Sequence, residues 1–358
     1  MIASRVLNFV AVVGSIVAVA AAVATRSIAA PVVGAPRTAE LKTAPAISLD
    51  QLKAQYRRPP SVPFPKDNPY TTAKAELGKT LYFDTRLSAS SLLSCAACHN
   101  PGFGWGDGQA KGVGHGMMQL ARRSPSIVNA AFGQIFMWDG RAASLEEQAL
   151  GPISGSAEMN LPIDQLMKRL ESIDGYERLF RAAFPKEGMS PSTLAKSLAT
   201  YERTVVSGRA PFDTWIEGDD KAISEAAKRG FVLFNGKAGC ANCHSGWNLT
   251  DDSFHDTGLA DADIGRGKIV PQVVKMQHAF KTPGLREIGR RGPYMHDGSL
   301  GTLGAVVEHY DRGGVDRPSR SDLVKPLGLS EQEKSDVEAF LKSLTSDVDP
   351  TTVPVLPR

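Results

Sequence analysis

Apolar side chains recur every three or four residues in four segments of the chain, which predicts amphipathic helices. The segments are 161–184, 192–206, 303–310 and 330–344. In the first of them the apolar positions include Leu166, Leu170, Ile173, Tyr176 and Phe180. Ser190-Pro191 and the capping box that begins at Ser330 are typical helix starts. Alternating strand patterns are few, so the sequence predicts a mainly α fold with long loops.

The first 29 residues have the pattern of a signal peptide. Arg5 supplies a positive start, residues 6–24 are uncharged and rich in Ala and Val, and Ser27-Ile28-Ala29 is a suitable cleavage site. An uncleaved membrane anchor is the alternative, because the apolar stretch nearly reaches spanning length. In both cases the rest of the chain is exported. We expect it in the periplasm, without stable membrane insertion once the signal is cleaved.

Composition and charge exclude several classes of protein. The 358 residues suit two domains of ordinary size. Hydrophobic residues make up 42% of the chain and charged residues 22%, which is typical of a soluble globular protein. The formal net charge is only +3 and no Lys/Arg run is present, so we expect no nucleic-acid binding.

All four cysteines lie in two C-x-x-C-H motifs, Cys95-Ala96-Ala97-Cys98-His99 and Cys240-Ala241-Asn242-Cys243-His244. Cysteines of exported proteins usually form disulfides, but this pattern is typical of c-type haem attachment. The two thiols bond the haem and the adjacent histidine becomes an axial ligand of its iron. A redox pair or half of a zinc site would explain one motif alone. Two motifs that use every cysteine predict two covalently bound haems c, with His99 and His244 as ligands.

A weak internal repeat suggests that the chain contains two related haem domains. Residues 75–83 precede the first haem motif, and the similar residues 227–234 precede the second. Each segment is predicted to be a helix that ends shortly before the loop with the cysteines. We therefore expect two cytochrome c-like domains, preceded by a signal peptide and by a Pro- and Ala-rich linker or arm. The predicted boundaries are 1–29 for the signal peptide, 30–70 for the arm, 71–215 for the N-terminal haem domain and 216–350 for the C-terminal haem domain.

Several ordered motifs resemble the bacterial dihaem cytochrome c peroxidase and MauG family. Besides the haem motifs, they begin at Leu81, Phe136, Glu147, Lys281 and Gly292: LYFDTRLS, FMWDGRA, EQALGP, KTPGLR and GPYMHDG. The resemblance covers about residues 70–345. It implies a peroxidase that uses hydrogen peroxide, with a peroxidatic N-terminal haem and an electron-transfer C-terminal haem.

The same resemblance assigns the peroxide pocket to Glu158 and Gln148. Peroxide must lose a proton from one oxygen and gain one on the other before its O–O bond breaks heterolytically. A carboxylate in a partly dry pocket suits this transfer. Glu147 is the rival, but it matches a helix position of the family. A solvated loop carboxylate is the alternative interpretation of Glu158.

Two residues indicate different branches of the family. His115 lies in a loop between Gly114 and Gly116. In the peroxidase branch a histidine at this place closes the first haem of the resting enzyme, whereas MauG-type proteins leave that haem open. Tyr310 lies fourteen residues after His296, where the peroxidase branch has Met and MauG has Tyr as the distal ligand of the second haem. A surface-loop histidine and a core tyrosine are the alternatives.

The neighbouring side chains Tyr294, Met295 and His309 compete with Tyr310 for the ligand position but are not assigned to it.

Trp138 resembles the tryptophan that lies between the haems of the family and carries oxidising equivalents from one to the other. MauG has a further tryptophan just before its second haem motif, but Lys237-Ala238-Gly239 replaces it here. Trp247 and Trp215 are candidate substitutes. A calcium ion often lies between the haems of the family, next to an Asn whose place Arg123 takes, so calcium is uncertain.

The sequence therefore favours a MauG-like dihaem peroxidase that oxidises a periplasmic protein partner by long-range electron transfer. The leading substrate class is a protein side chain, as in maturation of a tryptophan-derived cofactor or tryptophan oxidation on a copper-handling partner. A peroxide-scavenging cytochrome c peroxidase fed by small redox proteins is the close alternative. A dihaem electron-transfer cytochrome without catalysis is a third, which Glu158 and Gln148 disfavour because a pure carrier needs no acid/base group above an open iron.

Overall fold

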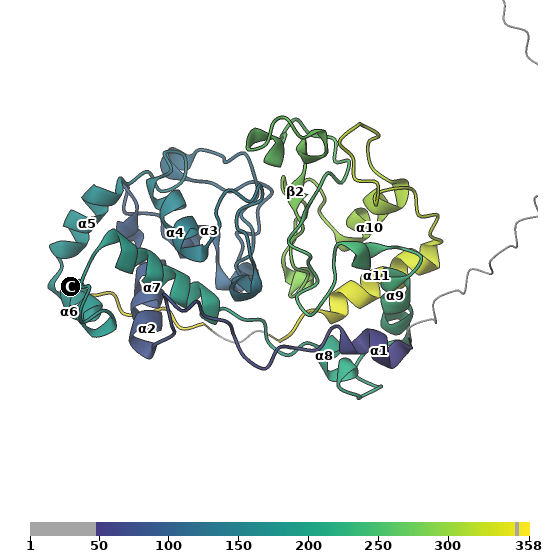
Figure 1. Cartoon of the computed structure of the whole chain (residues 1–358), viewed down its shortest axis with the longest axis horizontal. Coiled ribbons are helices and arrows are strands. Elements are labelled where there is room, and N and C mark those ends of the chain that lie inside the picture. Colours follow the sequence, from purple (N-terminus) through teal and green to yellow (C-terminus); the bar gives the residue numbers. More distant parts are fainter. Residues whose placement is uncertain (1–47, 348–350) are drawn as a thin grey trace, which may run out of the picture. The chain divides into compact units, whose positions relative to one another are not determined.

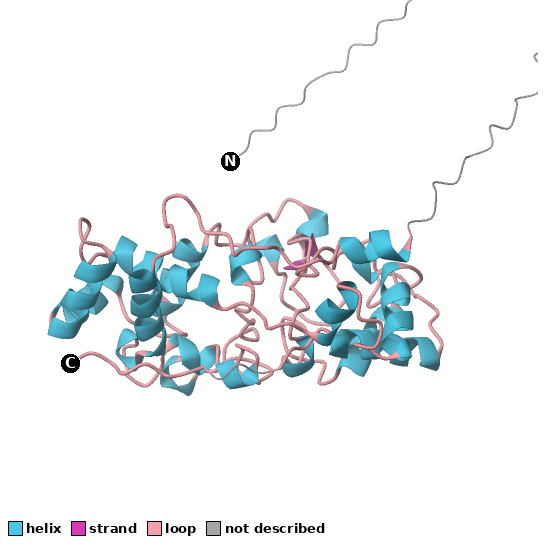
Figure 2. Ribbon diagram, turned by 90° about the horizontal axis from the view of Figure 1, so that it is seen from below, coloured by secondary structure: helices cyan, strands magenta, loops and turns pink. Residues whose placement is uncertain are grey.

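The computed structural model describes residues 48–347 and 351–358, and within them the chain is mainly helical (Figures 1 and 2). The only strands in these ranges are β1 (Phe254–His255) and β2 (Phe280–Lys281), which pair antiparallel. No helix in the described part of the chain is both long and apolar enough to cross a membrane. The predicted fold class is confirmed, whereas the predicted signal peptide lies outside the described residues.

Two groups of helices form two hydrophobic cores. The first core is built by α2 (Thr72–Phe83), α4 (Leu145–Ser154), α5 (Ile163–Glu171), α6 (Asp174–Ala183) and α7 (Pro191–Thr204). The second is built by α8 (Pro211–Ile216), α9 (Glu225–Asn235), α10 (Leu303–Arg312) and α11 (Glu331–Ser343). The first haem motif begins with the short helix α3 (Cys95–Cys98), and the second with a single 3-10 turn (Cys240–Asn242).

The internal repeat is visible in how one helix of each group crosses another. Gly78 of α2 faces Ser197 of α7, and Gly230 of α9 faces Asp336 of α11. A Cβ atom at either glycine would overlap the carbonyl oxygen of the residue opposite. Both glycines therefore permit a close crossing of two helices, and each crossing positions the haem motif that follows the first helix.

Residues at both ends of the described chain cross between the two groups. The helix α1 (Leu49–Ala54) leads to Tyr56, which is buried in the second core, while Asn68 is buried against the first group, where it contacts Glu146 and Lys196. Residues 351–358, which follow the second group in the sequence, lie against the first. There the carbonyl oxygen of Arg358 accepts a hydrogen bond from Gly175 N. The described part of the expected arm, residues 48–70, thus packs against both groups.

The predicted helix over residues 161–184 is wrong in one respect, because the structure has two helices there. The helix α5 ends at Glu171, where Ser172 bonds back to the carbonyl oxygens of Lys168 and Arg169. A new helix starts at Asp174, whose carboxylate suits a helix N-terminus. The other predicted helices are confirmed as α2, α7, α9, α10 and α11.

The expected boundary between residues 215 and 216 stays a proposal. The side chains of Phe212 and Trp215 pack in the second core, which favours a boundary a few residues earlier.

We predict that Gly78→Ala and Gly230→Ala each destabilise the haem-containing protein by about 3 kcal/mol, because the added methyl group forces two helices apart. Thermal or urea unfolding measures this effect. Gly301→Ala is the control, since a Cβ there meets no atom within 4 Å. Equal stability of all three variants would show that the close crossings do not hold the helices in place.

Candidate haem cavity and peroxide pocket

One cavity of about 950 Å³ is lined by both C-x-x-C-H motifs. Cys95, Cys98 and His99 come from the first motif, and Cys240, Cys243 and His244 from the second. All four thiols are free of disulfides. Burial raises the pKa of each thiol, to about 11 for Cys98 and Cys243, which keeps the sulfurs protonated and uncharged at neutral pH.

Both motif histidines are oriented by a backbone carbonyl group. His99 Nδ1 lies 2.8 Å from Pro125 O, and His244 Nδ1 lies 2.9 Å from Leu249 O. Burial lowers the pKa of both rings, so they are neutral. A neutral ring that donates its Nδ1–H to a carbonyl carries its lone pair on Nε2, the arrangement that metal-binding histidines use.

The charges around the cavity also fit haem, whose two propionates are anionic. Basic side chains exceed acidic ones in its lining; they are Arg122, Arg123, Arg141, Lys268, Lys281, Arg291 and Lys325. The acidic side chains are Asp139, Glu158, Glu202 and Asp252. One cavity is therefore lined by thiols, histidines and cations, the groups that could hold covalently bound haem c.

Glu158 and Gln148 both line this cavity, whereas Glu147 does not. Gln148 is on α4, and its buried Oε1 has no hydrogen-bond partner in the described structure. Glu158 follows α4 in a turn, where burial raises the pKa of its carboxyl group and Arg141 partly offsets that rise. Glu147 Oε2 instead accepts a hydrogen bond from Ala143 N at the exposed start of the helix.

The His115 side chain is not among the residues that line the cavity. Its backbone N–H donates to the carbonyl oxygens of Ala157 and Glu158, at 3.1 and 2.7 Å. Gly114 lies so close to Ala157 that a Cβ atom would overlap the carbonyl oxygen of that residue. The loop that carries His115 is thus fastened to the turn that carries Glu158, and displacement of one backbone segment would disturb the other.

Tyr310 lines the cavity from α10. Burial and the nearby Cys243 and Cys240 raise the pKa of its hydroxyl group. Of the three competing side chains, His309 Nε2 lies 2.9 Å from Thr257 O, and the Tyr294 hydroxyl donates to Ile288 O at 3.0 Å. Tyr294 and Met295 line the cavity as well. A hydrogen bond with the Thr257 side chain partly offsets the rise in the pKa of Tyr310.

Trp138 connects the two halves of the cavity wall. Its Nε1–H donates to Arg123 O at 2.9 Å, and its ring lies 6.4 Å from that of His296. The loop that carries Trp138 is held to the C-terminal half by Arg122, which pairs with Asp139 at 2.7 Å and with Asp263 at 2.6 Å.

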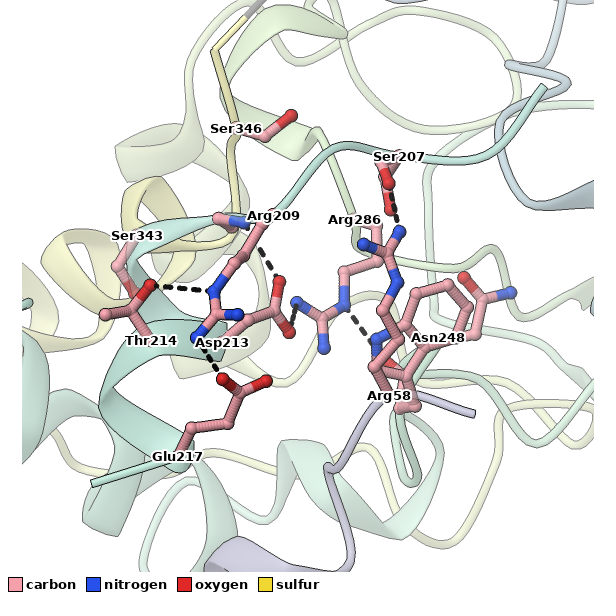
Figure 3. A network of polar contacts seen from close by, with 12 residues as sticks. Arg58, Ser207, Arg209, Asp213, Thr214, Glu217, Asn248, Arg286, Ser343 and Ser346 are labelled. Carbon is pink, nitrogen blue, oxygen red and sulfur yellow. Dashed lines mark hydrogen bonds and ion pairs between the residues drawn. The ribbon is translucent and has the colours of Figure 1, made fainter. Parts of the chain in front are cut away.

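The two candidate substitutes for the missing MauG tryptophan both lie beside cations. Trp247 has the guanidinium groups of Arg58 and Arg286 each 5.2 Å from its ring, and its buried Nε1–H has no acceptor among the described residues. Figure 3 shows these two arginines close together, with Arg286 paired to Asp213 at 2.8 Å. The ring of Trp215 has Lys53 Nζ at 3.8 Å. Nearby positive charge opposes removal of an electron from a ring.

Glu202 is a buried carboxyl group of the cavity that the sequence analysis missed. It is on α7, and burial raises its pKa to about 8. Its position could have been suspected from the spacing of Leu194, Leu198 and Glu202, which places a carboxyl group on the apolar face of a helix.

We predict that Glu202 makes the protein less stable as the pH rises from about 5 to about 8. The folded state keeps the proton up to pH 8 while the unfolded chain releases it near pH 4.5, so stability falls by roughly 1 kcal/mol per pH unit in that window and levels off above it. Glu202→Gln should remove this slope, as measured by urea unfolding across the window. The idea fails if parent and variant show the same pH dependence.

The comparisons with known proteins agree with this site. A family model described as di-haem cytochrome c peroxidase matches residues 72–221, and a cytochrome c model matches residues 227–345. The chain is 54% identical to the methylamine utilization protein MauG of Methylorubrum extorquens over 312 residues, 86% of this chain and 88% of that protein. It is 35% identical to the cytochrome c551 peroxidase of Pseudomonas aeruginosa over 86% of this chain and 89% of that protein.

A solved structure gives the same result at the level of fold. It is described as the crystal structure of a MauG-like protein associated with microbial copper homeostasis, with a TM-score of 0.75 and 31% sequence identity. The match covers 82% of this chain and 94% of that one. The thiol pairs, the oriented histidines and these relatives together show that the chain is a haem peroxidase-type oxidoreductase that belongs to the di-haem cytochrome c peroxidase and MauG family.

Proposed function

We propose that this protein is a MauG-like peroxidase that carries two covalent haems c and uses hydrogen peroxide to oxidise a side chain of a protein partner. One observation carries the proposal: Glu158, Gln148 and Tyr310 line the same cavity as both haem motifs. A simple electron carrier needs no buried carboxyl group in that position. The chemistry that haem supplies when bound is the binding and reductive cleavage of peroxide at iron.

Glu158 acts as the acid/base group in this proposal. Reduction of peroxide consumes two electrons and two protons and releases two molecules of water. The carboxylate of Glu158 takes the proton from one peroxide oxygen and returns it to the other. The raised pKa of Glu158 brings its proton affinity closer to neutral pH, which suits both steps. The carboxamide of Gln148 offers a donor and an acceptor to hold the peroxide in place.

Tyr310 acts as the distal ligand of the second haem iron in this proposal. A phenolate stabilises oxidised iron better than a thioether does, so this haem would store an oxidising equivalent rather than collect electrons from a small carrier. The higher identity to MauG, 54% against 35% for the cytochrome c551 peroxidase, supports this branch. It also favours a partner that belongs to methylamine utilisation over one that handles copper.

Trp138 would carry oxidising equivalents between the two haems in this proposal. Its hydrogen bond to Arg123 O and its place in the wall of the shared cavity support this role. We assign no such role to Trp247 or Trp215, because the cations beside them disfavour a positive charge on the ring. The signal-like N-terminus supports export to the periplasm.

The peroxide-scavenging cytochrome c peroxidase is the second candidate function. His115 is the residue that favours it, provided that its side chain closes the first haem. Its place outside the cavity lining and its attachment to Glu158 support the MauG-like branch instead.

We predict that Glu158→Gln keeps both haems but slows the reaction with peroxide by roughly 10²- to 10⁴-fold, which is the usual contribution of general acid–base catalysis to a rate. Stopped-flow spectroscopy of the ferric protein mixed with hydrogen peroxide measures the rate. Glu147→Gln is the matched control and should react like the parent, because Glu147 lies off the cavity. A parental rate in Glu158→Gln would remove this residue from the mechanism.

We predict that Tyr310→Phe changes the low-spin electron paramagnetic resonance signal of the second ferric haem, because the phenolate ligand is lost. Tyr294→Phe makes the same chemical change at the competing tyrosine and should leave that signal alone. An unchanged signal in Tyr310→Phe would refute tyrosinate ligation and move the preference to the scavenging peroxidase.

A further inference from the structure

The cavity wall contains a buried arginine where the two halves of the protein meet. Arg123 is only 6% exposed. It comes two residues before Pro125, whose carbonyl oxygen holds the His99 ring. Its own positive charge is close enough to His99 to lower the pKa of that ring. Arg123 is therefore adjacent to the first haem site.

Arg123 also bonds to the other half at several points. Its backbone N–H donates to His296 O at 2.8 Å, and its guanidinium group donates through Nη2 to Arg291 O. Its backbone carbonyl oxygen accepts the indole N–H of Trp138. One residue thus links the first haem site, the tryptophan between the sites and two residues of the C-terminal half.

The surroundings of Arg123 do not suit a calcium ion, which takes six to eight oxygen ligands. A second guanidinium group, that of Arg291, is buried nearby: burial and, after it, the charge of Arg123 lower its pKa to about 10. Burial lowers the pKa of Arg123, and Asp107 is the carboxylate whose negative charge partly offsets that effect. It already accepts hydrogen bonds from Ser124 Oγ and Gln109 N. A divalent cation next to two guanidinium groups would be strongly repelled.

The described ranges contain one group of three side chains that could hold a metal ion, Cys243 with Asp251 and His255. Cys243 belongs to the second haem motif, and thioether formation would remove its thiol from that group.

We propose that Arg123 takes over the role of a bridging calcium ion: it supplies a permanent positive charge between the two haem sites and ties the two halves together without any metal. Arginine suits this role because it stays protonated in proteins and offers five donors in a fixed geometry. Unlike an ion, the side chain cannot be removed by a chelator. The inference rests on the two haem sites of the proposed function.

The first test measures calcium in the haem-containing protein. Purified protein is incubated with excess calcium, passed through a desalting column and analysed by inductively coupled plasma mass spectrometry. We expect far less than one calcium per chain, and we expect the same haem spectra and peroxide reactivity before and after treatment with EDTA. One calcium per chain, or a spectral change caused by EDTA, would overturn the proposal.

The second test measures the charge of Arg123 through the haem reduction potentials. Arg123→Met removes the charge and keeps most of the volume, whereas Arg123→Lys keeps the charge. Loss of a buried positive charge favours the oxidised iron, so Arg123→Met should lower the reduction equilibrium constant of at least one haem on the order of tenfold. Arg123→Lys should stay near the parent, which a purely structural role would not require.

Arg312→Met is the control for loss of an exposed cation, because the Arg312 side chain is 75% exposed and lies outside the cavity lining. Parental potentials in Arg123→Met would contradict the proposal. Its failure is distinguishable from failure of the proposed function, since calcium content and potentials are read on protein whose haem number and peroxide reaction are measured separately.

Discussion

The structure depends on one cavity that brings the two C-x-x-C-H motifs together. The cavity has a volume of about 950 Å³ and both C-x-x-C-H motifs line it, so the chain must present the groups of two attachment sites on one shared surface. The lining provides thiols for covalent attachment, neutral histidines for iron and cations for propionates. Both hydrophobic cores border the cavity, so we expect haem attachment to stabilise the folded chain.

The need to line one shared cavity from both halves explains why so much of the chain is loop. The loops that carry the cavity residues are held by a few strong contacts rather than by regular structure. Arg122 joins Asp139 to Asp263 across the two halves, and the N-terminal arm and the C-terminal segment both lead from the second group of helices to the first. The chemistry therefore depends on contacts between segments that are far apart in the sequence, which keep Glu158 and Tyr310 on one shared cavity.

Local patterns predict the parts of the protein that are defined locally. The haem attachment residues follow from a five-residue motif, and α7, α10 and α11 follow from helical periodicity with their capping residues. The roles of Glu158 and Tyr310 could be predicted only from the resemblance to a family. In a single sequence nothing distinguishes them from an ordinary loop carboxylate and an ordinary core tyrosine. Glu202 was not predicted although helical spacing places it on the apolar face of α7. The hydrogen bonds of Arg123 and the burial of Tyr56 were not foreseen, because contacts between distant segments create them. The break at Ser172 was missed because apolar periodicity continues across it.

The central claim is that two covalently attached haems share this one cavity, and intact-mass spectrometry with peptide mapping tests it most directly. The account predicts a mature chain with the mass of two haems added, one on Cys95 and Cys98 and one on Cys240 and Cys243. A chain with a single haem, or with free thiols at either pair of cysteines, would contradict it.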